Sequence, residues 1–155
     1  MNVDFYFNID IEKFFADGKE LLEKHWDELA NYKDVIELNP DIEKYKKLQE
    51  LGYVKTVSAY VDGEMVGYSG VILSPLLHYK SDIDAFVDVI YVNPDFRNTT
   101  IGIQLINKTE ELAKECGASV ITHHVKPDHP TLAVLLKRKK YKLAEYKYSK
   151  LLKGT

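Results

Sequence analysis

The central part of the chain restricts its fold most, because a strand, a helix and a second strand follow one another there. Residues 85–92 are an almost unbroken apolar run, interrupted by Asp88, and a helical apolar stripe at 105–116 stops before Gly117. Residues 119–125 again have the composition of a strand. Strands joined through a helix normally lie parallel in one sheet. This segment therefore predicts an α/β fold with at least one parallel strand pair.

The flanking segments add helices and antiparallel strands. Asp62-Gly63 separates two segments rich in β-branched and aromatic residues, which predicts a β-hairpin. Asn39 as N-cap, Pro40 at the first helical position and Gly52 after the last apolar residue predict a helix. The full expected order is a strand at 3–7, helices at 11–30 and 39–52, strands at 54–61, 64–73 and 85–92, a helix ending at 117, a strand at 119–125, a helix at 130–140 and a strand at 141–152.

Length, charge and cysteine content exclude several classes of protein. The chain has 155 residues, of which 45% are hydrophobic, so we expect one domain spanning residues 1–155 with a sizeable core. A net charge of −3 and a pI near 6.0 argue against a protein that binds the nucleic-acid backbone. A single cysteine, Cys116, and no leader or long apolar run indicate a cytoplasmic protein without a disulfide or a membrane segment.

The segment from Asp88 to Gly102 carries the main functional signal. A buried-type strand runs into a short polar loop that opens a helix. The first N–H groups of a helix have no acceptor within it, and the helix dipole adds positive potential at the same point. This arrangement suits a phosphate or pyrophosphate. We therefore expect an anionic cofactor, although a strand, a proline turn and a threonine-capped helix also occur together in α/β proteins without such a ligand.

The same loop, together with the element order, resembles the GCN5-related N-acetyltransferase (GNAT) superfamily over almost the whole chain. The family motif is Arg or Gln, two residues, Gly, one residue, and Gly or Ala. Here it reads Arg97-Asn98-Thr99-Thr100-Ile101-Gly102 and is preceded by Val92-Asn93-Pro94. Thr100 replaces the first glycine. A threonine supplies a backbone N–H as well as glycine does, provided that its φ and ψ are accessible to a β-branched residue.

Three further segments resemble small phage and prophage members of this superfamily. They are His25-Trp26-Asp27-Glu28 in the first long helix, Leu77-His78-Tyr79 before the fourth strand, and Tyr148 with Lys150 near the end. The resemblance implies a mixed, mostly antiparallel β-sheet with splayed central parallel strands and helices on both faces.

The resemblance also implies acetyl-CoA as the acyl donor and an amine as the acceptor. Pantetheine contacts would fall on Ile90, Tyr91 and Val92, and His129 stands where many members have an asparagine beside pantetheine. The pyrophosphate contacts are carried over to Arg97, Asn98, Thr99, Thr100, Ile101 and Gly102. No metal is expected, because His123 and His124 point to opposite faces of a strand.

Acetyl transfer from a thioester to an amine needs an unprotonated amine, a polarised carbonyl and a proton for the leaving thiolate. Members of the family often have a catalytic glutamate where this chain has Phe86, and a catalytic tyrosine where it has Leu136. These roles have therefore moved to other residues or are absent.

Four residues are candidates for these catalytic roles. Asp88 is a candidate base, since the two-residue strand period places it on the same face as Ile90 and Val92; the alternative is a carboxylate satisfied by a neighbouring element. His78, in the loop expected to enter the central gap, is a second candidate base. The other two are Glu28, which could bind the amine or take its proton, and Tyr79, which shares the role of candidate acid with Tyr141; surface solvation of Glu28 and simple packing of the tyrosines are the alternatives.

These observations favour an N-acetyltransferase that acts on a primary amine of a small molecule or a protein. Two alternatives remain: a GNAT-fold module that holds CoA or a partner protein without turnover, and an unrelated α/β interaction domain. About fifteen residues follow the last expected helix, which is short for the two strands that commonly end this family. We therefore expect an exposed sheet edge that a second copy covers, giving a homodimer.

Overall fold

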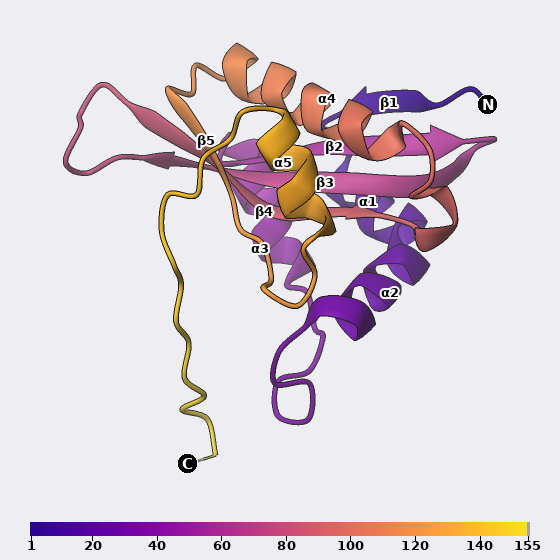
Figure 1. Ribbon diagram of the computed structural model, residues 1–155, viewed down its shortest axis with the longest axis horizontal. Helices are drawn as coiled ribbons and strands as arrows, with labels where there is room; N and C mark the ends of the chain where they lie inside the picture. Colours follow the sequence, from indigo (N-terminus) through magenta and orange to yellow (C-terminus); the bar gives the residue numbers. More distant parts are fainter. Residues whose placement is uncertain (155) are drawn as a thin grey trace.

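A computed structural model describes residues 1–154 of the chain. Figure 1 shows a twisted sheet with helices packed against it. In chain order the elements are β1 (Asp4–Phe7), α1 (Ile11–Asp17), α2 (Lys19–Leu29), α3 (Ile42–Glu50), β2 (Val54–Val61), β3 (Glu64–Pro75), β4 (Ile83–Val92), a 3-10 turn at Pro94–Phe96, α4 (Ile101–Glu115), β5 (Val120–His123) and α5 (Thr131–Arg138).

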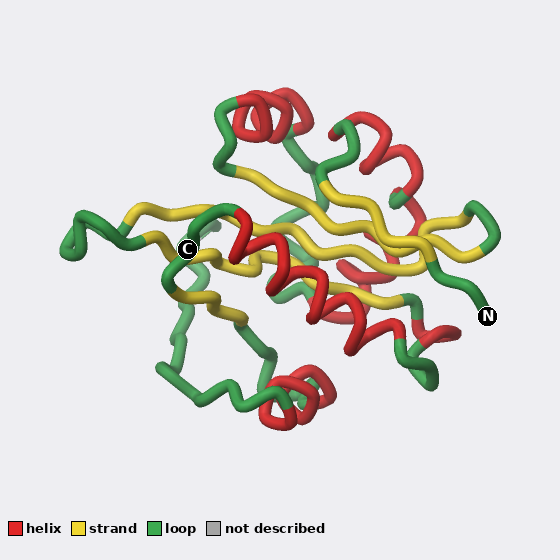
Figure 2. Tube along the Cα trace, turned by 90° about the horizontal axis from the view of Figure 1, so that it is seen from above, coloured by secondary structure: helices red, strands yellow, loops and turns green. Residues whose placement is uncertain are grey.

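The five strands form one sheet in the order β1-β2-β3-β4-β5. Neighbouring strands are antiparallel except β4 and β5, which pair in parallel. Helices α1 to α3 lie on one face, and α4 lies on the other with α5 beside it (Figure 2). The expected mixed, mostly antiparallel sheet with helices on both faces is confirmed.

The hairpin between β2 and β3 is confirmed at the expected turn. Asp62 has φ 51° and Gly63 has φ 81°, so both central residues lie in the left-handed region. This is the backbone of a type I′ turn, which matches the twist of the two strands it joins and which Asp-Gly favours. The hairpin places Tyr68 and Ser69 in the middle of the sheet, directly opposite Tyr91 and Ile90 of β4.

Both predicted N-terminal helices differ from the expectation in detail. The helix expected over 11–30 is two helices, α1 and α2, that meet at Gly18. The Gly18 N–H donates to the Phe14 carbonyl at 2.9 Å, and a Cβ on Gly18 would stand 2.9 Å from the same oxygen and 3.2 Å from the Met65 sulfur. The next helix starts after Asp41 instead of Asn39, because the Asp41 carboxylate accepts the Lys44 N–H at 3.0 Å and is the actual N-cap.

The strand expected at 141–152 is wrong. After α5 the chain leaves the sheet as an extended arm without strand pairing (Figure 1). Its apolar side chains find no buried face: Leu143 is 72% exposed and Tyr148 is 94% exposed. A strand needs a neighbouring strand for its backbone groups as well as suitable residues, and residues 141–152 pair with no strand.

Candidate active site

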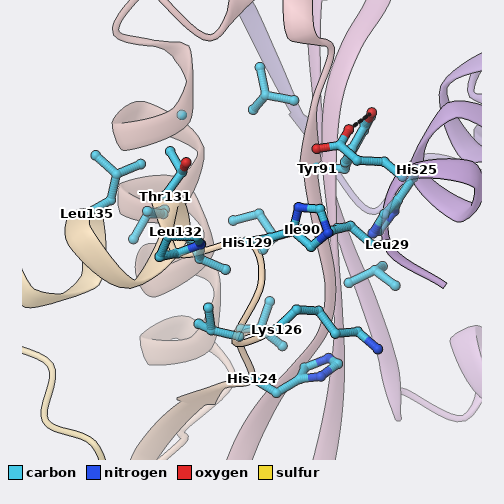
Figure 3. A pocket seen from close by; sticks show the side chains of 18 of the residues that line it. His25, Leu29, Ile90, Tyr91, His124, Lys126, His129, Thr131, Leu132 and Leu135 are labelled. Atoms are coloured by element: carbon cyan, nitrogen blue, oxygen red, sulfur yellow. Dashed lines mark hydrogen bonds between the residues drawn. The ribbon is translucent and has the colours of Figure 1, made fainter. Parts of the chain in front are cut away.

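A cleft opens where β4 and β5 part. The two strands pair only between Asp84–Val87 and Val120–His123, so the rest of β4 has no neighbour on that side. A cavity of about 440 Å³ occupies the gap, between α2 and the sheet on one side and α4 and α5 on the other (Figure 3). Its lining includes His25, Glu28, Asp88, Ile90, Tyr91, Val92, Arg97, Gly102, His124, Lys126, Asp128, His129, Thr131, Leu132 and Leu135.

The end of β4 presents backbone hydrogen-bonding groups to this cleft. The Asn93 N–H donates to the Val66 carbonyl of β3 at 2.8 Å. Because neighbouring residues of a strand direct their backbone groups to opposite edges, Tyr91 also bonds toward β3, while Ile90 and Val92 direct N–H and C=O into the gap. The Val92 carbonyl already accepts from Arg97 Nε at 2.9 Å. The N–H groups of Ile90 and Val92 are therefore the donors available to a ligand amide or carbonyl.

The start of α4 presents backbone N–H donors, here called the cradle, at one end of the cleft. Within residues 1–154, the N–H groups of Thr100, Gly102 and Ile103 have no hydrogen-bond acceptor. The Ile101 N–H instead donates to the Thr99 hydroxyl at 3.2 Å. Thr100 has φ −83°, an ordinary right-handed conformation, so a β-branched residue fits where the family motif has glycine. The departure from the motif therefore leaves the cradle intact.

Arg97 does not aim its guanidinium at that cradle. Its two Nη atoms donate to the Glu28 carboxylate at 2.8 Å each, and its guanidinium lies 4.9 Å from the centre of the Tyr91 ring. Glu28 also accepts the Tyr91 hydroxyl at 2.7 Å. The bonds from Arg97 and then from Tyr91 lower the pKa of Glu28 and keep it ionised. Arg97 thus ties α2 to the loop after β4, and Glu28 is a weak base.

His25 adds a stacked aromatic group beside this ion pair. Its ring lies parallel to that of Tyr91 with a centroid distance of 4.5 Å, and Nδ1 is 2.6 Å from the Tyr68 hydroxyl. Burial lowers the pKa of His25 to about 4, so the ring is neutral at neutral pH. Burial followed by the bond to Glu28 raises the pKa of Tyr91 to about 12. The α2 side of the cleft is therefore a rigid polar wall around Tyr91.

Asp88 occupies a β-bulge, and this corrects the orientation expected for it. Gly70 is opposite Val89 and Val71 is opposite Val87, so Asp88 is the extra residue without a partner on β3. The bulge breaks the two-residue period: Val87 and Ile90 both pack toward α4. Asp88 borders the cleft and a smaller cavity of about 50 Å³ beside Tyr45, so it does not share the face of Ile90 and Val92.

His124 contacts the bulge from the loop side. Its Nε2 lies 2.6 Å from the Asp88 carbonyl oxygen, and its ring packs 5.3 Å from that of Phe86. A carbonyl only accepts, so Nε2 carries the proton in this hydrogen bond. In the neutral ring, Nδ1 then carries a lone pair that can accept a proton. It belongs to a ring that packs beside Phe86, the position where the family often has its glutamate. In the sequence, His124 stands out only beside His123 as a possible pair of metal ligands, and no local pattern predicts its contact with Asp88.

The structure does not bring His78 and Tyr79 to the cleft. They lie in the loop that precedes β4, whereas the cleft is lined by the second half of that strand, residues 87–92. Tyr79 is 64% exposed, and its ring centroid lies 6.5 Å from that of the neighbouring His78. The loop that was expected to enter the gap contributes no residue to the lining of the cleft.

The predicted cofactor-binding positions lie at the cleft or in the loop beside it. His129 lines the cleft next to Thr131, as do Ile90, Tyr91, Val92, Arg97 and Gly102. Asn98, Thr99, Thr100 and Ile101 belong to the loop and cap that shape the cradle. Leu136 is buried at 7% exposure. Within residues 1–154 no group of histidine, cysteine or acidic residues is arranged to hold a metal ion, and no helix is long and apolar enough to span a membrane.

Fold and cleft together define an α/β protein whose parallel strand pair splays open above a helix N-terminus. Residues 16–138 match the model of the acetyltransferase (GNAT) family. The chain therefore belongs to the GNAT family of acetyltransferases. A comparison with curated protein sequences gives no match.

Solved structures of acetyltransferases share the whole fold. An aminoglycoside acetyltransferase from an uncultured soil metagenomic sample is 17% identical with a TM-score of 0.75, covering 98% of this chain and 99% of that one. A ribosomal-protein-alanine N-acetyltransferase from Brucella melitensis biovar Abortus 2308 is 21% identical with a TM-score of 0.69, covering 99% and 100%. An aminoglycoside N-acetyltransferase in complex with CoA is 14% identical with a TM-score of 0.75, covering 98% and 95%. At these sequence identities the likeness shows a shared fold and nothing further.

Proposed function

We propose that the protein transfers an acetyl group from acetyl-CoA to a primary amine of a small molecule or a protein. The observation that carries this proposal is the continuous path from the unpaired end of β4 to the cradle at the start of α4. The donors at Ile90 and Val92 suit the amides of a pantetheine arm, and the N–H groups of Thr100, Gly102 and Ile103 suit its pyrophosphate. His129, Leu132 and Leu135 close the opposite side.

Direct transfer fits the polar groups of the cleft. A thioester carbonyl held against the N–H of Ile90 or Val92 would be polarised, and the tetrahedral oxygen that forms would be stabilised there. Two groups at the bulge can take the proton of the attacking amine: the carboxylate of Asp88 and Nδ1 of His124. Collapse of the tetrahedral intermediate would break the C–S bond, and the CoA thiolate would leave and take a proton from the protonated base or from water. Glu28, held ionised by Arg97, is better suited to attract the cation than to accept its proton.

The acceptor class is inferred from the carboxylates of this cleft. Glu28, Asp88 and Asp128 line it, together with the cations Arg97 and Lys126. These carboxylates favour a cationic amine. Aminoglycosides, polyamines and lysine side chains share this chemistry, and an aminoglycoside and a ribosomal protein are acceptors named for two structural relatives.

The alternative is a binding module that holds CoA without turnover. It is favoured by Phe86 and Leu136, which replace the glutamate and tyrosine that many members use. The two functions differ in thiol release and share the cleft.

Calorimetry with acetyl-CoA tests the cleft through a matched pair of variants at Gly102. A Cβ there would lie 3.6 Å from the Leu135 side chain, an ordinary contact, so Gly102→Ala should bind as the parent does. Gly102→Pro removes one N–H of the cradle. Loss of a hydrogen bond to a charged group, about 1.5–3 kcal/mol, predicts binding weaker by about tenfold or more.

Thiol release then separates the enzyme from the binding module. The parent protein is assayed with acetyl-CoA and a panel of polyamines, aminoglycosides and lysine peptides. Release with at least one acceptor supports the proposed reaction. Tight binding of acetyl-CoA without release by any acceptor supports the module, and absence of binding by the parent rejects both.

A further inference from the structure

His25 of α2 is held by a hydrogen bond to a tyrosine that is itself almost completely buried. Nδ1 of His25 lies 2.6 Å from the Tyr68 hydroxyl, and Tyr68 is 1% exposed. Within residues 1–154 this hydroxyl has no other hydrogen-bond partner. A phenol can donate or accept and so can a ring nitrogen, and the surroundings of the two groups therefore decide which one donates.

The Tyr68 hydroxyl is the donor in this bond. Burial raises the pKa of Tyr68, so the phenol keeps its proton at neutral pH. If Nδ1 of His25 donated instead, the phenol proton would be left buried without an acceptor, which costs free energy. Nδ1 therefore accepts, and the proton of the neutral imidazole is on Nε2.

The Nε2–H group of His25 is open to the cleft. The two nitrogens of an imidazole ring face in divergent directions, so Nε2 points away from Tyr68. Within residues 1–154 it has no hydrogen-bond partner and stays accessible, whereas both ring nitrogens of His123 are buried without one. His25 lines the cleft beside Tyr91, across from Leu132 and Leu135 (Figure 3). A neutral hydrogen-bond donor is therefore available there to a bound molecule.

This donor lies close to the reacting end of the cleft. The His25 ring stacks on that of Tyr91 at 4.5 Å, and Tyr91 stands between Ile90 and Val92, whose N–H groups would hold the thioester. Glu28, one turn further along α2, also lines the cleft, and its carboxylate would attract an ammonium group. Burial lowers the pKa of His25 to about 4, so the ring is neutral and does not repel that cation.

We propose that His25 selects the acceptor by donating from Nε2 to an oxygen on the carbon next to the one that bears the amine. His25 and Glu28 are neighbours on one helix face, so the oxygen and the amine that they contact must be a few bonds apart. Amino alcohols and amino ethers have this arrangement, and so does the α-amine of a peptide, which is followed by a carbonyl. Lysine side chains and simple polyamines lack it. The proposal rests on the acetyl transfer proposed above, and Tyr68 is a positioning residue that acts through His25.

NMR spectroscopy of the histidine rings tests the tautomer independently of catalysis. Long-range ¹H–¹⁵N correlation at neutral pH should show Nδ1 of His25 unprotonated and Nε2 protonated, with the signals assigned by their loss in His25→Asn. Tyr68→Phe removes the hydroxyl that fixes the ring and should let the other tautomer appear. A His25 ring that is protonated on Nδ1 in the parent protein would overturn the proposal.

Matched amines test the selection itself. Butylamine and methoxyethylamine have the same number of heavy atoms, and only the second has the oxygen; glycine methylamide supplies the carbonyl of a peptide. For the two oxygen-containing amines, kcat/KM for thiol release is divided by the value for butylamine. His25→Asn keeps an acceptor for Tyr68 but loses the donor, so at least one ratio should fall by about two- to tenfold, mainly through KM. His25→Gln, whose longer amide reaches the position of Nε2, should restore part of the loss.

His78→Asn is the matched control, because it is the same substitution at an exposed histidine outside the cleft, and both ratios should stay unchanged. A fall in the methoxyethylamine ratio alone identifies amino alcohols or ethers, and a fall in the glycine methylamide ratio alone identifies peptides. Equal ratios in the parent and His25→Asn overturn the selection and leave acetyl transfer intact.

Failure of the proposed function gives a different result. If the parent protein releases no thiol with any amine, the acetyltransferase proposal fails. Calorimetry with the CoA-loaded protein then gives the Kd of the same three amines, and the same ratios are compared between the parent and His25→Asn. Equal Kd ratios, or no binding of any amine, would overturn the role of His25 as well.

Discussion

The ion pair between Glu28 and Arg97 predicts a measurable coupling between α2 and the loop that follows β4. The relevant perturbation is a double-mutant cycle of Glu28→Gln, Arg97→Gln and the double variant. Two charges about 4 Å apart attract by ~1–4 kcal/mol for effective dielectric constants between 80 and 20. The Arg97 and Glu28 side chains are 36% and 28% exposed, which moves the expected value toward the lower end.

We expect a coupling free energy of about 1–2 kcal/mol, above the ~0–1 kcal/mol of most surface pairs. The excess comes from the two parallel N–H···O bonds at 2.8 Å and from Tyr91, which holds the same carboxylate. For a domain of this size, loss of 1 kcal/mol lowers Tm by about 2–4 °C. Urea unfolding of the four proteins measures the coupling, and 1 M NaCl should reduce it.

The pair Lys108–Glu111 on α4 provides a control for this cycle. Its N···O distance is also 2.8 Å, but the side chains are 40% and 47% exposed, and the further contact of Lys108 is a cation–π contact with the Phe7 ring at 5.9 Å. Its coupling should be about 0.3–0.5 kcal/mol. If the Glu28–Arg97 cycle is additive within ~0.3 kcal/mol, the inference that this pair joins α2 to the cradle loop is refuted.

Three further predictions concern stability and turnover. Burial lowers the pKa of His25 and His123 from 6.5 to about 4. As the pH falls from 6.5 to 4, these histidines are therefore protonated in the unfolded chain before they are protonated in the folded one, and the free energy of unfolding decreases. Urea unfolding at pH 7 and pH 5 should differ by up to ~2 kcal/mol per histidine, and equal values would contradict the burial. Gly70→Ala should destabilise the protein by about 1–3 kcal/mol, because its Cβ would stand 2.9 Å from the Val89 side chain at the bulge. It should also weaken acetyl-CoA binding in calorimetry. Unchanged binding would show that the geometry of the bulge does not affect the cleft. Asp88→Asn or His124→Ala should lower kcat more than it changes KM, and if neither affects kcat, no base acts at the bulge.

Much of the fold follows from local signals in the sequence. Asp62-Gly63 specifies a turn whose two positive φ values few other pairs adopt, and Gly117, with φ 78°, ends α4 at the expected place. The break at Gly18 was not predictable from helical periodicity, since apolar residues continue on both sides of it. The restriction at this position includes a tertiary part, because a Cβ at residue 18 would stand 3.2 Å from the sulfur of Met65 on the distant strand β3.

At the candidate site, the backbone geometry at the start of α4 is as the motif predicts. The cradle needs N–H groups and a permitted φ, both of which Thr100 supplies, so the motif was informative despite its altered residue. Prediction failed where a side chain depends on tertiary placement. His78 resembles a base by residue type, but its loop lies at the wrong end of β4. His25 and Glu28, three residues apart on α2, do share one helix face, which is the signal that sequence reasoning could have used.

Asp88 shows why strand periodicity alone cannot orient a candidate catalytic residue. One extra residue reverses the facing of everything that follows it, and the register that reveals the extra residue exists only between β3 and β4. The single local sign is Gly70, the residue opposite the bulge, where a side chain would collide with Val89. The reversal has a functional consequence, because it places Tyr91 on the α2 face and leaves Ile90 and Val92 to pack toward α4 with their backbone N–H groups in the gap. Asp88 thus leaves the expected face with its side chain, while its carbonyl oxygen lies 2.6 Å from Nε2 of His124, the other candidate base at the bulge.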